Sequence, residues 1–172
     1  GEPGVIEVIV PGWIDLATHR WGVINPPFGP AAVRWTKEAG ELALAGRIDA
    51  MVSAPLNKEA MHQAGYSYEG QTEILGELTQ SKPAMVMVVD RMRLMLFTNH
   101  MAMRQVCDYV RTDRVLERLV LADAALRDMG IARPSIAIAG LNPHASENGL
   151  FGREELDQIV PAVEAAKARG ID

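Results

Sequence analysis

The sequence lacks several features that would otherwise assign it to a class of proteins. Cys107 is its only cysteine, so the chain can form no internal disulfide and a cytoplasmic location is favoured. No apolar stretch is long enough to cross a bilayer. The formal net charge is −5 and the sequence holds no basic cluster, which argues against nucleic acid and membrane surfaces as partners. No Gly-x-Gly-x-x-Gly follows a strand-like run, so the common dinucleotide-binding motif is also missing.

The composition is that of a folded protein. Hydrophobic residues make up 48% of the 172 residues, which is enough to build a core and argues against disorder. No linker divides the chain, so we expect a single α/β domain over residues 1–172. The first residues, Gly1-Glu2-Pro3, include neither an initiator Met nor a signal-peptide pattern, and we expect the domain to be a fragment of a longer protein.

Strand-like and helix-like segments alternate along the chain, which is typical of α/β proteins. Strands are expected over residues 5–10, 48–53, 84–89, 94–98 and 135–139. Helices are expected over residues 31–45, 72–79, 112–129 and 154–169, with a short helix capped by Asn57. The tight connection at Asp90-Arg91 predicts a hairpin. The expected architecture is therefore a three-layer α/β/α sandwich around a mixed sheet.

Residues 141–155 are the most informative stretch, because they follow the last expected strand and precede the last expected helix. Open α/β sheets bind ligands at such places. The stretch holds His144, which can ligate a metal, Glu147, which can accept a hydrogen bond from that histidine, and Arg153, which can grip an anion at the helix start. The alternative is an ordinary connecting loop with one unrelated histidine.

Three polar residues each follow the end of an expected strand: Lys58, His100 and His144. Strands of one sheet can bring such ends into one crevice, so we expect the two histidines to lie close together. Neutral imidazole suits zinc and also cobalt, nickel or iron. A catalytic metal needs about three protein ligands, so two histidines would be an incomplete set. The alternatives are two loop histidines with local partners and a solvated helix lysine.

Three motifs, in the same order along the chain, resemble the 4-hydroxythreonine-4-phosphate dehydrogenase (PdxA) family. They are Ala54-Pro55-Leu56-Asn57-Lys58 with Gly70-Gln71-Thr72-Glu73, then Thr98-Asn99-His100-Met101, then Asn142-Pro143-His144-Ala145 with Gly152-Arg153-Glu154-Glu155. The resemblance runs over about residues 43–155. It implies the fold of the isocitrate and isopropylmalate dehydrogenases, of which this chain would be the central portion in a longer two-domain enzyme.

The resemblance also implies an activity, which is oxidation of a small anionic hydroxy acid by NAD or NADP, with decarboxylation and the help of a divalent metal. His100 and His144 match metal ligands of the family, whose third histidine lies beyond Asp172. Zinc is the favoured metal, with magnesium, cobalt, nickel and manganese as alternatives. The family binds its nicotinamide cofactor largely through a C-terminal portion, so residues 1–172 alone should be inactive.

The same resemblance implies substrate contacts. Gln71 and Thr72 stand where the family has a His and a Thr that contact substrate, and the change to Gln71 leaves open whether the substrate is phosphorylated. Lys58 is the candidate catalytic residue, since it can neutralise a phosphate or carboxylate. Arg153 is a further candidate anion ligand. Thr72 could instead cap a helix, and Arg153 could instead pair with Asp157 or a neighbouring glutamate.

The family is homodimeric, cytoplasmic and linked to pyridoxine biosynthesis, and these properties are expected here by resemblance. Residues 84–110 are our candidate dimer surface, because they are rich in Met and carry His100. The alternative for these residues is that they fill the core. Two other functions remain open. One is a non-catalytic metal-binding or dimerisation domain, and the other is a metal-dependent hydrolase that uses Glu147 as its base.

Overall fold

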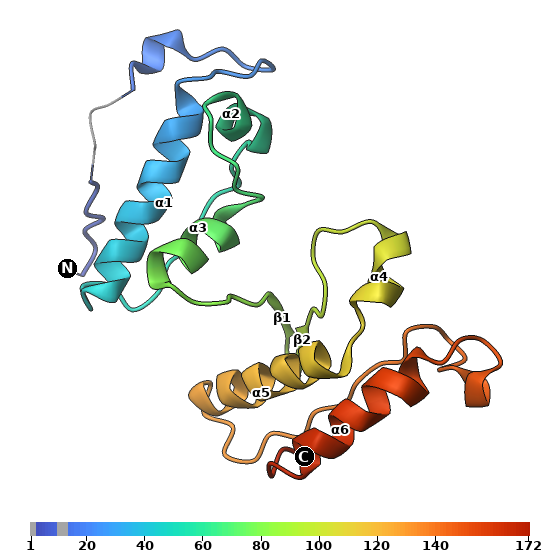
Figure 1. The fold of residues 1–172 in the computed structure, drawn as a ribbon. Coiled ribbons are helices and arrows are strands. Elements are labelled where there is room, and N and C mark those ends of the chain that lie inside the picture. The colour runs from blue at the N-terminus through green and yellow to red at the C-terminus, as the bar shows by residue number, and fades with distance from the viewer. Residues whose placement is uncertain (1–2, 10–13) are drawn as a thin grey trace. The chain divides into compact units, whose positions relative to one another are not determined.

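The computed structural model describes residues 3–9 and 14–172, which fall into two compact units (Figure 1). The first unit is Gly1–Ala84 and the second is Met85–Asp172. Helices and a β-hairpin are both present, so the α/β composition expected from the sequence is found. The two units are taken in turn below, because each has a hydrophobic core of its own.

The first unit is built around three helices. These are α1 (Phe28–Leu44), α2 (Lys58–Gln63) and α3 (Gln71–Thr79), preceded by the short helix η1 (Leu16–Thr18). α1 packs against both α2 and α3, and Val33, Met61 and Ile74 form the core between them. Asn57 caps α2 as predicted, because its Oδ1 accepts the backbone N–H of Ala60 at 2.9 Å.

The close approach of α1 to α2 requires a glycine. A Cβ atom on Gly29 would lie 2.6 Å from the carbonyl carbon of Ala60 and would overlap its oxygen. We therefore expect Gly29→Ala to destabilise the protein by about 1–3 kcal/mol, even though alanine is the better helix former. Urea unfolding measures this loss. Glu41→Ala, at an exposed position of the same helix, should change stability by less than about 0.5 kcal/mol. Equal stability of the two variants would contradict the close approach.

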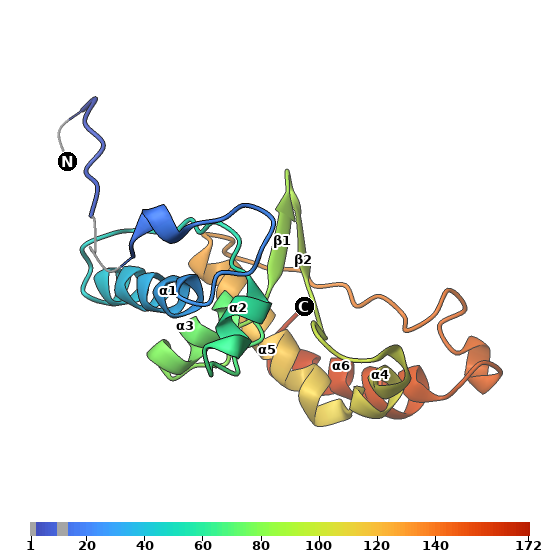
Figure 2. The same cartoon turned by 90° about the horizontal axis from the view of Figure 1, so that it is seen from above.

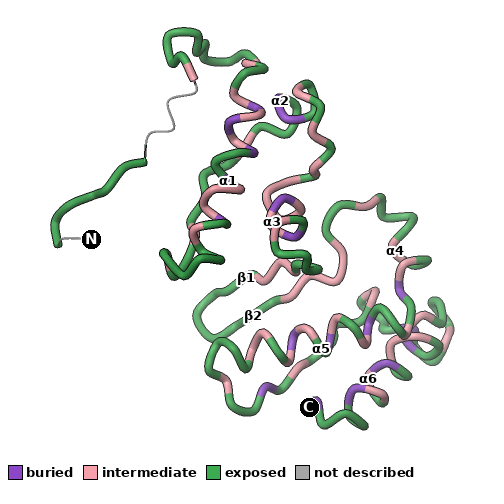
Figure 3. Tube along the Cα trace, turned by 60° about the vertical axis from the view of Figure 1, so that its left-hand side comes forward, coloured by how far each residue is buried: buried purple, intermediate pink, exposed green. Residues whose placement is uncertain are grey.

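The second unit combines a hairpin with two packed helices. Strands β1 (Val86–Val89) and β2 (Met92–Met95) pair antiparallel, as the tight connection predicted. The helices are α4 (Met103–Tyr109), α5 (Thr112–Asp128) and α6 (Val160–Lys167), with the short turns η2 (Glu147–Gly149) and η3 (Glu155–Ile159) between α5 and α6. α5 and α6 lie side by side (Figure 2), and both helices carry buried residues, purple in Figure 3. Val115 and Leu119 of α5 and Ala162 and Ala166 of α6 belong to one core cluster. The helix expected over residues 154–169 is found over residues 154–167, and its first part, η3, is π-helical.

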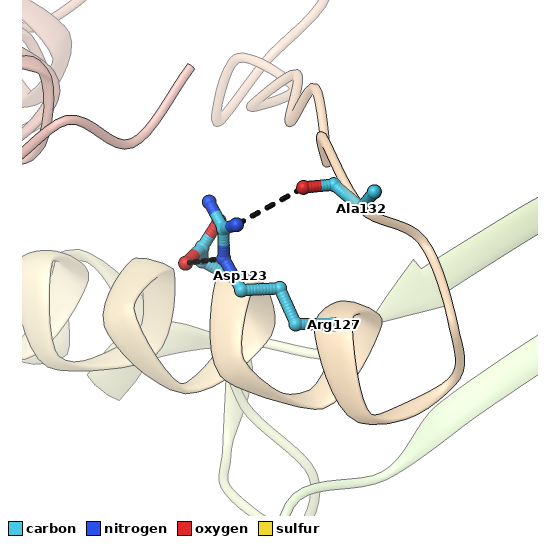
Figure 4. Close-up of polar contacts among 3 residues, drawn as sticks. All are labelled: Asp123, Arg127 and Ala132. Carbon is cyan, nitrogen blue, oxygen red and sulfur yellow. Dashed lines mark hydrogen bonds and ion pairs between the residues drawn. The ribbon is translucent and has the colours of Figure 1, made fainter.

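Arg127 links the C-terminal end of α5 to the turn that follows it (Figure 4). Its Nε lies 2.8 Å from Oδ2 of Asp123 one turn earlier, and its Nη1 donates to the carbonyl oxygen of Ala132 at 3.1 Å. Gly130, with a φ of +87°, follows the helix end as the sequence indicated. The turn that leads toward residues 135–139 is therefore held against the helix by one side chain.

Three expected strands are not formed in the part of the chain that the structure describes. Residues 48–53 and 135–139 adopt neither strand nor helix, and neither do residues 5–9, while Val10 lies outside the described residues. An apolar run becomes a strand only where another strand supplies its backbone hydrogen bonds. Ile136 instead donates its N–H to the carbonyl oxygen of Asp172 at 2.8 Å, and Val52 is fully exposed. The mixed sheet expected from the sequence is therefore represented only by the hairpin among the described residues.

The hairpin and the start of α4 carry exposed apolar side chains. Met87, Met92 and Met103 are all more than half exposed, so these members of the 84–110 segment do not fill a core. Their exposure leaves them available for the dimer contact that the sequence predicts, which stays a prediction. Of the helices in the described ranges, none has both the length and the apolar character needed to span a membrane.

Candidate functional site

The loop that carries His144 has an unusual backbone. Four successive residues without a glycine among them, Ala145, Ser146, Glu147 and Asn148, have φ values of 45°, 67°, 43° and 58°. Residues with a Cβ atom rarely adopt this left-handed conformation, and such backbone persists only where its surroundings hold it. The loop Leu141–Glu155 is therefore held in a defined conformation by its surroundings and is not a flexible connection.

The His144 ring is oriented by its neighbours. Nδ1 lies 3.1 Å from Oε2 of Glu147, the backbone N–H donates to Oδ1 of Asn142 at 2.9 Å, and the ring centroid is 4.7 Å from that of Phe151. The predicted contact with Glu147 is confirmed. Nε2 has no hydrogen-bond partner within the described residues, and the side chain is 59% exposed. An imidazole held by a carboxylate through one nitrogen and free at the other has the arrangement of a metal ligand.

His100 lies in the loop between β2 and α4. It is exposed, and it makes no hydrogen bond or ion pair with any residue in the described ranges. Both of its ring nitrogens are therefore open to a ligand. In the same ranges, no three His, Cys, Asp or Glu side chains gather closely enough to hold a metal ion. The predicted proximity of His100 and His144 stays a prediction.

Arg153 has the ion pair that the sequence offered as its alternative role. Its Nε and Nη2 donate to the two carboxylate oxygens of Asp157 at 3.0 and 2.8 Å, one turn away. The hydrogen bonds to Asp157 raise the pKa of the Arg153 guanidinium. Both groups are largely exposed, so this pair contributes little to stability. Any anion bound by Arg153 would have to share the guanidinium with Asp157.

Lys58, Gln71 and Thr72 all belong to the first unit. Lys58 is exposed at the first position of α2. Gln71 opens α3, donates from Nε2 to the carbonyl oxygen of Ala54 at 3.1 Å and accepts the Ser53 hydroxyl at 2.5 Å. Its side chain thus joins α3 to the segment that precedes α2.

Thr72 does not cap α3, contrary to the alternative considered from the sequence. The helix begins at Gln71 after Gly70, which places Thr72 at the second helical position. Gly70 occupies the capping position of α3, and no side chain caps this helix. The Thr72 hydroxyl is half-buried and makes no hydrogen bond to a described residue. It therefore remains able to contact a ligand at the start of α3.

The sequence did not point to the carboxylate that holds the His144 loop together. Glu155 is only 7% exposed, and its two oxygens accept the backbone N–H of Leu141 at 2.8 Å and the hydroxyl of the fully buried Ser146. The Ser146 hydroxyl, and after it the backbone N–H groups, keep the pKa of Glu155 below its usual value although burial acts in the opposite direction. Burial distinguishes Glu155 from the less buried Glu154 beside it, and the amino-acid sequence alone does not show which of two adjacent glutamates is buried.

Comparison with known proteins gives a consistent result. The family model described as "Pyridoxal phosphate biosynthetic protein PdxA" matches residues 4–172. The D-threonate 4-phosphate dehydrogenase of Pectobacterium atrosepticum is 44% identical over 171 residues, which cover 99% of this chain and 52% of that protein. The chain thus spans about half the length of the curated relatives it matches.

Two solved structures show the same similarity. The 4-hydroxythreonine-4-phosphate dehydrogenase from Klebsiella pneumoniae is 43% identical, with a TM-score of 0.83 over 90% of this chain and 48% of that one. The enzyme of the same name from Burkholderia phymatum is 39% identical, with a TM-score of 0.81 over 99% of this chain and 52% of that one. The match extends on both sides of the residues 43–155 that carried the resemblance.

Proposed function

The chain belongs to the PdxA family, and from this premise we propose that the full-length protein is a metal-dependent dehydrogenase of a phosphorylated hydroxy acid. The oxidant is NAD or NADP, and the oxidised acid loses its carboxylate. The observation that carries the proposal is the His144 ring, oriented by Glu147 through Nδ1 and free at Nε2, inside the matched family region.

The proposal includes the fold of the complete enzyme. We propose that residues 1–172 are one α/β portion of a longer two-domain enzyme with a three-layer α/β/α architecture like that of the isocitrate and isopropylmalate dehydrogenases. Two observations support it. The chain spans about half the length of its relatives, and the apolar segments at residues 48–53 and 135–139 lack the strand partners that such a sheet would provide.

His100 and His144 would hold the metal. Both present at least one imidazole nitrogen without a partner in the described residues, which suits zinc first and also cobalt or nickel. Magnesium and manganese remain alternatives through the family resemblance, and they would need oxygen ligands in addition. A bound metal supplies Lewis acidity toward the hydroxyl that is oxidised and the carbonyl that results. Glu147 contributes by keeping the proton on Nδ1 of His144, so that Nε2 stays a lone-pair donor.

The substrate's negative charge would be met by Lys58, with Gln71, Thr72 and Arg153 as further contacts. Lys58 is exposed and Thr72 has an uncommitted hydroxyl, whereas the amide of Gln71 is already engaged by Ser53 and Ala54. Gln71 would therefore shape the site more than it would bind an anion. The relatives' names, D-threonate 4-phosphate dehydrogenase and 4-hydroxythreonine-4-phosphate dehydrogenase, favour a phosphorylated four-carbon hydroxy acid.

We further propose that the enzyme is a cytoplasmic homodimer and that residues 84–110 contribute to its interface. The exposed methionines of this segment provide an adaptable apolar surface, and a symmetric dimer would use it on both chains. Neither nucleic acid nor a membrane is a partner in this proposal, in keeping with the charge of −5.

The test is an activity measurement on the full-length protein. After removal of metal with a chelator, the protein is supplied with zinc or cobalt, NAD or NADP, and either D-threonate 4-phosphate or unphosphorylated D-threonate. We expect NADH or NADPH absorbance only when metal is restored, and faster turnover of the phosphorylated acid. Metal binding without any turnover would favour the non-catalytic metal-binding domain instead. Turnover that is independent of metal would contradict the proposed role of the two histidines.

A further inference from the structure

Glu155 is a buried charged group that the proposed reaction does not use. Its side chain is 7% exposed, and that of Ser146 is completely buried. A carboxylate can be buried only if its oxygens are well supplied with hydrogen bonds. Here one oxygen accepts the N–H of Leu141 and the other accepts the hydroxyl of Ser146. These two donors stand on either side of His144 in the sequence, so a single carboxylate closes the loop that carries the histidine.

The loop needs such a closure because its backbone is strained. Ala145 through Asn148 all have positive φ values, a conformation that residues with a Cβ atom avoid. Ser146 lies at the centre of this run, and its carbonyl oxygen accepts the N–H groups of Gly149 and Phe151 at 2.9 and 3.1 Å. Ser146 therefore connects the strained backbone, the turn after it and the buried carboxylate.

The conformation of this run also sets the place of the histidine's carboxylate partner. Glu147 is itself one of the left-handed residues, and its N–H donates to the carbonyl oxygen of His144 at 3.0 Å. Its side chain then reaches back to Nδ1 of the imidazole at 3.1 Å. If the backbone relaxed to a common conformation, the Glu147 carboxylate would move away from the ring.

The helical turn that begins at Glu155 is a second irregular feature next to the His144 loop. η3, Glu155–Ile159, is a π-helical turn directly before α6. Such wide turns are rare and occur frequently at functional sites. The turn starts at the residue whose side chain reaches back into the loop, so the irregularity and the buried carboxylate coincide.

We propose that the Ser146–Glu155 pair is a positioning element that holds the His144 loop in its strained conformation and so aims the imidazole Nε2 at the metal. The inference rests on the proposed function, because it concerns the same metal site. In this role Ser146 and Glu155 would not bind the metal or the substrate themselves; they would act through the backbone of residues 145–148 and through Glu147.

Four variants of the full-length protein separate the parts of this role. Glu155→Ala removes both acceptors, while Glu155→Gln keeps an oxygen for the Leu141 N–H and an amide that can donate to the Ser146 hydroxyl. Ser146→Ala removes the hydroxyl and keeps the strained backbone. Ser146→Gly removes the hydroxyl at a position where glycine adopts a φ of 67° without strain.

Cobalt(II) is the probe, since its visible absorbance reports ligand geometry and titration gives its affinity. We expect Glu155→Ala and Ser146→Ala to weaken cobalt binding about tenfold or more and to alter the absorbance spectrum, because residues that orient a metal ligand affect metal affinity by this amount. Glu155→Gln should restore most of the affinity, and Ser146→Gly should bind more tightly than Ser146→Ala. Met61→Ala, which removes core volume in the other unit, controls for lost stability and should leave the cobalt spectrum unchanged.

The outcomes separate this inference from the proposed function. Cobalt binding by the unmodified protein, with the same affinity and spectrum in the Glu155 and Ser146 variants, would overturn the positioning role alone. Failure of Glu155→Gln to do better than Glu155→Ala would overturn the hydrogen-bonding basis of the role. No cobalt binding by the unmodified protein would overturn the proposed function and this assignment with it.

Discussion

Replacing His144 by alanine in the full-length protein is expected to weaken zinc or cobalt binding by more than about a hundredfold. This loss exceeds the one expected when only a residue that hydrogen-bonds to a metal ligand is removed. NADH formation should disappear with it. The reason is that Nε2 of His144 is the imidazole nitrogen that the loop leaves free, while Glu147 holds Nδ1. His100→Ala should have an effect of similar size, because the two rings are proposed to share one metal.

His62→Ala is the matched control for these variants. Nε2 of His62 lies 3.1 Å from the carbonyl oxygen of Tyr68, so this ring already has a local partner in the first unit. Its removal should leave metal affinity and turnover within about twofold of the unmodified protein. Calorimetric titration with zinc measures all three variants. If His144→Ala bound zinc as tightly as His62→Ala does, His144 would not be a ligand and the proposed site would be wrong.

Among the stability variants considered, Met61→Ala should lower the free energy of unfolding the most, by about 2–5 kcal/mol. Met61 is fully buried between α1 and α3, in contact with the small cluster that includes Val33 and Ile74. Removal of three heavy atoms leaves a cavity that these few neighbours cannot refill. Urea unfolding of the full-length protein, followed by tryptophan fluorescence, gives the change.

Leu44→Ala provides the comparison for Met61→Ala. Leu44 ends α1 and is 61% exposed, so its truncation should cost less than about 1 kcal/mol. A Met61→Ala variant as stable as Leu44→Ala would mean that the cluster around Met61 is not a tightly packed core. The first unit would then depend for its stability on contacts with other parts of the protein.

Several features of this protein were determined by the sequence alone, and they are the ones that depend on near neighbours. The hairpin follows from a tight connection between two apolar runs, and the cap of α2 follows from one asparagine. The contact of His144 with Glu147 spans three residues, and the ion pair of Arg153 with Asp157 spans four. The family could also be identified, because its motifs are short and ordered.

Tertiary structure decided the features that depend on distant partners. The apolar runs at residues 48–53 and 135–139 read as strands, yet they form none here, since strand formation needs backbone groups from another segment. The sequence likewise indicated a histidine loop but not its closure. Glu155 becomes distinctive only when folding buries it beneath Leu141 and Ser146, nine residues and more away along the chain. Its charge can be buried because those donors converge on it, and their convergence is a property of the folded loop.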